Sequence, residues 1–134
     1  MTTARTLLFT LLAMFALHAT ATAQLPPMPP APTSLVGNYD ITNLDGTPVS
    51  PGNSVSIEVS VQGGVMIGLV RVNGVTLPGE TVTFELVAAN PLIYSWTNVA
   101  GNSGLVAWNV ANQRFEQRIF TGPNAGSVRA LCPR

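Results

Sequence analysis

The most constraining feature of this sequence is an alternation of apolar and polar residues with a period of two. Residues 54–61 alternate valine or isoleucine with serine or glutamate, and residues 81–87 repeat the pattern with threonine and glutamate. Successive side chains of a β-strand point to opposite faces, so this pattern predicts strands with one buried and one solvent-exposed face. No segment after residue 24 keeps a helical period over about 11 residues.

Turn-forming residues separate these runs. Asn73-Gly74 stands between Val72 and Val75, and it predicts a tight hairpin because both turn residues tolerate the positive φ of a type I′ turn. The same reasoning along the chain predicts nine strands at residues 36–43, 54–61, 65–72, 75–77, 81–89, 92–98, 105–111, 114–121 and 127–132.

The fold class that follows is all-β, a small antiparallel meander of eight or nine short strands. Short connections place consecutive strands side by side, and only Leu44–Asn53 is a long gap. An up-and-down barrel is favoured over a β-sandwich because closure removes exposed strand edges. The sandwich stays open as the alternative.

The predicted core consists of the apolar members of these runs. Residues 65–72 are apolar on both faces as far as Arg71, which predicts a central or doubly covered strand. The core candidates are Val55, Ile57, Val59, Ile67, Leu69, Val82, Phe84, Leu86, Ile93, Trp108, Phe115 and Ile119.

The chain divides into three parts. Residues 1–23 have the basic start, apolar stretch and Ala21-Thr22-Ala23 ending of a signal peptide, which predicts a secreted or periplasmic protein. A membrane anchor is the alternative, but the apolar stretch is shorter than the roughly 20 residues that span a bilayer. Residues 24–34 contain five prolines and predict an extended tether, and residues 35–134 predict a single β domain.

The charge balance excludes several classes of protein. Only 9% of residues are charged and the formal net charge is zero, which argues against a nucleic-acid binder. After cleavage no Lys and no His remain, because the single histidine, His18, lies in the signal peptide. Nucleophilic catalysis by a histidine-based triad and a zinc site both need side chains that this domain lacks. We therefore expect no enzyme, no catalytic residues, no cofactor and no metal.

Acidic residues leave two alternatives open. The six carboxylates contain material for the acid–base pair of a glycosidase, but most alternate with buried neighbours or precede turns. Asp40, Asn43 and Asp45 offer oxygen atoms for a calcium ion, yet Thr47-Pro48 follows instead of further ligands. Turn formation accounts for the same three residues.

Three aromatic residues are the candidate ligand-binding site. Tyr94, Trp96 and Trp108 lie on two strands that flank the turn 101–104. A loop of three or five residues places Trp96 directly opposite Trp108, in one contiguous aromatic patch. Such a patch is either a core pair or a surface for a sugar or small ligand.

Arginines and a single cysteine are the other candidates. Arg71, Arg114, Arg118 and Arg129 either lie on a solvated face, with Glu116 as a local partner, or clamp an anion bidentately. A buried Arg71 requires a carboxylate such as Glu58 or Glu85.

Cys132 alternates with Val128 and Ala130, which predicts a small buried side chain. The alternative is an intermolecular disulfide that joins two copies of the chain or a protein partner.

Two functions fit these features. The first is a secreted, non-catalytic β domain that binds a small apolar ligand or a glycan. The second is a structural or interaction protein of the cell envelope, suggested by the tether, the low charge and Cys132. A cavity of at least about 300 Å³ favours the first function, whereas a solid core with an apolar exterior favours the second.

Overall fold

A computed structural model describes residues 26–134. The predicted signal peptide lies outside the described residues. The described part contains nine strands and one short 3₁₀ helix, η1. Their bounds are β1 Gly37–Asn43, β2 Val55–Gln62, β3 Val65–Val72, β4 Val75–Thr76, η1 Pro78–Glu80, β5 Val82–Ala89, β6 Leu92–Asn98, β7 Ser103–Asn109, β8 Arg114–Ile119 and β9 Val128–Pro133.

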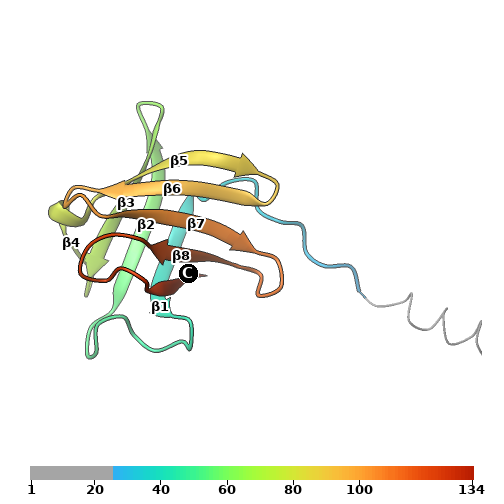
Figure 1. The fold of residues 1–134 in the computed structure, drawn as a ribbon. Coiled ribbons are helices and arrows are strands. Elements are labelled where there is room, and N and C mark those ends of the chain that lie inside the picture. Colours follow the sequence, from blue (N-terminus) through green and yellow to red (C-terminus); the bar gives the residue numbers. More distant parts are fainter. Residues whose placement is uncertain (1–25) are drawn as a thin grey trace, which may run out of the picture. The chain divides into compact units, whose positions relative to one another are not determined.

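Eight strands form a closed ring in which neighbours along the chain are neighbours in the sheet (Figure 1). The ring runs from β1 through β2, β3, β5, β6, β7, β8 and β9, every pair is antiparallel, and β9 returns to pair with β1. The short β4 adds to β3 outside the ring. This arrangement confirms the all-β prediction and the up-and-down barrel, and it excludes the sandwich.

The predicted strands agree with the observed ones to within two residues at every end. Asn73 and Gly74 have φ values of 50° and 80°, as a type I′ hairpin requires, and Val72 pairs with Val75 across them. The alternating pattern and the turn residues therefore predicted the strand positions correctly.

The barrel interior contains one contiguous apolar core. Six of the predicted core residues are buried there: Ile57, Val59, Val82, Phe84, Phe115 and Ile119. Val55 and Trp108 are partly buried against the same cluster. The buried residues that the prediction left out include Leu35, Tyr39, Ile41, Leu92, Tyr94, Trp96, Val106 and Leu131.

Four core predictions are wrong. Ile67, Leu69 and Ile93 are only half-buried and lie on the outer face, because Gly68 and Tyr94 occupy the inward positions of their strands. Strand β3 is thus not doubly covered.

Leu86 is 59% exposed although its strand position points inward. The pairing of β3 with β5 ends at Met66 and Phe84, so β3 does not cover the second half of β5. Figure 1 shows the β2–β3 hairpin projecting past β5 at this point.

A glycine decides which face of β3 is inward. A Cβ atom on Gly68 would lie 2.6 Å from Cδ1 of Ile57 and 2.9 Å from a ring carbon of Phe84. These two large side chains, from the strands on either side, meet over the glycine. The inward row of β3 therefore includes a residue without a side chain, and its larger neighbours Ile67 and Leu69 point outward.

Charged residues of the outer face form ion pairs. Arg71 contacts Glu58 at 2.7 Å, and Arg114 contacts Glu116 at 3.1 Å. Burial by itself raises the pKa of Glu116, but hydrogen bonds from Asn109, Arg114 and Asn112 together outweigh this effect and lower that pKa. The Glu116 cluster joins β7, β8 and the turn between them.

The Glu116→Gln variant tests this cluster. Because the folded protein holds the pKa of Glu116 below its unfolded value of about 4.3, the stabilisation is complete above that pH and is lost as pH falls through the folded-state pKa. We expect the free energy of unfolding in urea to fall by about 1 kcal/mol at pH 7. The difference between variant and wild type should shrink at low pH.

The matched control is Glu85→Gln, which changes an exposed outer-face carboxylate on β5. It should leave the free energy of unfolding unchanged at both pH values. A Glu116→Gln effect that does not depend on pH would contradict the role assigned to the charge.

Candidate functional site

The two ends of the barrel differ in how they are closed. At one end Leu35, which precedes β1, is completely buried, and its carbonyl oxygen accepts a 2.8 Å hydrogen bond from the Tyr39 hydroxyl. Burial, followed by the nearby Tyr94 phenol, raises the pKa of Tyr39. Phe115 packs edge-on against Tyr39 and Trp108, with ring centroids 6.1 and 5.1 Å away. Side chains therefore fill this end around Leu35, and a groove remains only beside the β2–β3 hairpin, where Phe84, Leu86 and Tyr94 help to line it.

The other end contains a cavity of about 230 Å³. It is bounded by the end of β1, β3, β6 and β8 and by the start of β2, β5 and β9, together with the connecting loops. Its apolar lining consists of Ile41, Val49, Val55, Ile57, Val70, Val72, Leu77, Val82, Trp96 and Ile119. Its polar lining consists of Glu80, Asn98, Asn102, Gln117, Asn124 and Arg129.

The cavity wall beside β7 depends on a glycine. Trp96 on β6 pairs with Gly104 on β7, and its indole Nε1 donates a 3.2 Å hydrogen bond to the carbonyl oxygen of Arg118 on β8. A Cβ atom on Gly104 would overlap that carbonyl oxygen and lie 2.8 Å from the indole nitrogen. The glycine therefore lets the indole cross β7 and cover the gap between β6 and β8.

Arg129 is the charged residue that faces the cavity from β9. It pairs with Gln117 on β8 and with Asn43 on β1, two residues along the strand from the buried Leu131. Its Nε is buried and has no hydrogen-bond partner among residues 26–134. Burial lowers the pKa of Arg129, and the nearby Glu80 carboxylate opposes that shift.

The three sequence-predicted site residues share the inner face of the barrel. Tyr94 and Trp96 are each 4% exposed, and Trp108 is partly buried against the core. The expected opposition of Trp96 and Trp108 is wrong, because Trp96 pairs with Gly104. Trp96 lines the cavity, whereas Trp108 belongs to the filled end.

The register of β6 and β7 follows from the loop between them. The side chain of Asn98 accepts a 2.9 Å hydrogen bond from the Asn102 backbone, and the Asn98 backbone donates one of 3.0 Å to the Asn102 carbonyl. These bonds begin β7 at Ser103, earlier than the sequence pattern indicated. Trp108 is thereby moved four residues away from the position opposite Trp96.

The contacts of Arg71, Arg118 and Asp45 are accounted for by their neighbours in the fold or by solvent, without a ligand. Arg71 is only partly buried, and it pairs with Glu58, one of the two carboxylates named for the case of a buried Arg71; Arg118 is exposed on the outer face. Asp45 accepts hydrogen bonds from the side chain and the backbone of Thr47, which lower the pKa of Asp45. This turn accounts for Asp45 without a bound ion.

Cys132 is half-buried and free, with its sulfur 3.8 Å from the Thr42 hydroxyl. Its strand β9 turns the opposite face inward from the one predicted, because Arg129 and Leu131 point into the barrel. The sequence did contain a signal for this: Arg129 lies two residues before the apolar Leu131, so the two side chains point to the same face of β9.

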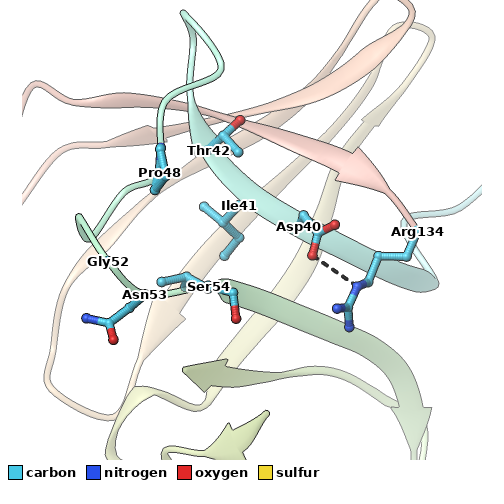
Figure 2. Close-up of a pocket in the computed structure, with 9 residues that line it drawn as sticks. Asp40, Ile41, Thr42, Pro48, Gly52, Asn53, Ser54 and Arg134 are labelled. Carbon is cyan, nitrogen blue, oxygen red and sulfur yellow. Dashed lines mark ion pairs between the residues drawn. The ribbon is translucent and has the colours of Figure 1, made fainter. Parts of the chain in front are cut away.

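A second hollow lies on the outside of the barrel wall. Figure 2 shows it between β1 and the segment that leads into β2, where the pairing of these strands has stopped at Asp40 and Ser56. Its volume is about 440 Å³, and the exposed ion pair of Asp40 with Arg134, at 3.0 Å, borders it. Ile41 and Val55 line both this groove and the inner cavity.

The chain matches no protein-family model, no curated protein and no solved structure. Within residues 26–134, no helix has the length and apolar character needed to cross a membrane. The same residues contain no group of three or more His, Cys, Asp or Glu side chains placed to hold a metal ion.

The Gly104→Ala variant tests the cavity wall. A methyl group at this position displaces either the Arg118 carbonyl or the Trp96 indole, so we expect the free energy of unfolding to fall by about 1–3 kcal/mol. Gly79→Ala is the matched control, since a Cβ there meets nothing within 4 Å and its φ is not positive. Chemical denaturation followed by tryptophan emission measures both, and equal effects would contradict the proposed packing.

The Arg129→Met variant tests whether Arg129 serves the fold. An enclosed N–H without an acceptor costs free energy, so a thioether of similar length should stabilise the protein by up to about 1 kcal/mol. Arg118→Met, at an exposed position of β8, should leave stability within about 0.5 kcal/mol. A loss of stability in Arg129→Met would mean that the guanidinium has a structural role.

Proposed function

We propose that residues 35–134 form a secreted or periplasmic, non-catalytic domain that binds a small, largely apolar ligand inside the barrel. The observation that carries this proposal is the cavity at one end, lined by aliphatic side chains and Trp96 and edged by amides. Ligand sites in proteins share this composition, a mostly apolar hollow with a few convergent polar groups.

The volume of the cavity limits the ligand. About 230 Å³ is below the roughly 300 Å³ that we expected of a ligand-binding domain, the volume at which sites for drug-sized ligands begin. The ligand is therefore either a compact molecule or one end of a longer one. A glycan on an exposed aromatic surface is less well supported, because Tyr94 and Trp96 are buried.

The ion pairs support a non-catalytic role. Asp40, Glu58 and Glu116 each contact an arginine, and these three carboxylates lie outside the inner cavity. Glu80 is the one carboxylate among the residues that line that cavity. A pair of carboxylates facing a common substrate, which glycoside hydrolysis requires, is thus absent from its lining.

The runner-up is an interaction protein of the cell envelope. The observation that favours it is a group of exposed apolar side chains on the projecting β2–β3 hairpin and on β5: Val61, Val65, Leu86 and Val87. Val61, Val65 and Leu86 help to line a groove of about 450 Å³. Concentration-dependent sedimentation that Leu86→Ser abolishes would support this function, and a dimer seen only without reductant would assign it to Cys132.

Ligand binding is tested with purified residues 24–134 and a panel of small neutral aromatic and aliphatic compounds and short oligosaccharides. We expect an apolar compound to bind saturably, with amide chemical-shift changes at Gly104 and at the Trp96 indole. Val70→Phe, which fills the cavity, should weaken binding at least tenfold.

The control for this experiment is Val87→Phe, which adds the same ring at a position 60% exposed on β5. It should bind like the wild type. If Val70→Phe retains the affinity of the wild type, or if shift changes appear only for oligosaccharides at outer-face residues, the cavity is not the site.

A further inference from the structure

The inner cavity contains an arginine, Arg129, that has a carboxylate nearby, Glu80, but forms no ion pair with it. Among residues 26–134, Arg71, Arg114 and Arg134 each form an ion pair with a carboxylate, and Arg118 is exposed. Arg129 forms no ion pair within the described residues, and its Nε is buried without a hydrogen-bond acceptor.

Arg129 is partly buried, and its Nε is the guanidinium atom that is enclosed without an acceptor in the described part of the chain. A buried donor without an acceptor costs free energy, and a ligand oxygen beside it would remove that cost. The guanidinium offers N–H donors in a planar fork that matches the two oxygen atoms of a carboxylate. Gln117 lies beside Arg129 on the same inner face and adds an amide donor at the same level of the barrel. An anion bound there would lie beside Arg129 and Gln117, in a cavity whose lining is otherwise mostly aliphatic.

The charges around the cavity select the type of anion. Arg129 is the single cation of its lining, and Glu80 contributes a negative charge to the same lining. A carboxylate brings one negative charge and matches one guanidinium. A phosphate monoester brings nearly two charges at pH 7 and would leave an excess negative charge next to Glu80.

We propose that the cavity binds a small monocarboxylic acid with an apolar body, whose carboxylate pairs with Arg129 and whose body lies against Ile57, Val70 and Val82. This inference depends on the proposed function, since it names the chemical class of the ligand for the same cavity. It also explains why the buried Nε of Arg129 has no acceptor within the described residues.

The test compares hexanoate with hexanamide, 1-hexanol and hexyl phosphate, titrated into the wild-type protein at pH 7 by calorimetry. We expect hexanoate to bind at least tenfold more tightly than hexanamide, and more tightly than hexyl phosphate. In Arg129→Met this preference for the acid should disappear while hexanamide and 1-hexanol still bind. Arg118→Met should behave as the wild type.

A second variant keeps the inference testable if Arg129→Met does not fold. Glu80→Gln removes the competing carboxylate from an exposed position in η1, so hexanoate affinity should rise severalfold and hexanamide affinity should not change. Equal binding of acid and amide by the wild type, or tighter binding of hexyl phosphate, would overturn the monocarboxylate. Failure of all four compounds to bind would instead count against the cavity as a site.

Discussion

The pairing of β9 with β1 is the contact on which the rest of this structure depends, because it joins the last strand to the first and closes eight of the nine strands into a ring. Closure fixes an inside and an outside for every strand at once. Closure also leaves no strand of the ring with an unpaired edge at its middle level. Many β proteins protect such edges with charged side chains, and a chain with only 9% charged residues has few of them to use. The inner cavity exists because the ring closes around side chains that do not fill one end.

The sequence alone predicted the strands and the barrel because alternation and turn residues are local signals. It did not predict which face of β3 or β9 is inward. In β3 both faces are apolar, and the choice depends on Ile57 and Phe84 meeting over Gly68, which are contacts between strands. In β9 an alanine and a cysteine resemble core residues, whereas Leu131 marks the inner face. The register of β6 and β7 depends on backbone and side-chain hydrogen bonds within one loop, which composition does not reveal.

The candidate site was predicted only in part for the same reason. Trp96 was chosen as a candidate because it is aromatic, and it does line the cavity. Its side chain is buried, however, and does not form an exposed aromatic patch. Arg129 was one of several arginines whose partners were unknown. Only the three-dimensional arrangement separates it from Arg71 and Arg114, which have carboxylates, by placing it inside the barrel. A cavity lined from seven strands has no contiguous motif to be recognised in the sequence.

The end of the barrel at Leu35 is closed by a residue from outside the sheet. Leu35 closes the filled end, yet it precedes β1 and belongs to no strand; its carbonyl is held by the Tyr39 hydroxyl. Shortening or replacing the approach to β1 would remove the acceptor of the Tyr39 hydroxyl while every strand pairing stayed in place. The sealing of this end is thus set by a segment that contributes nothing to the sheet, and it can vary independently of the barrel.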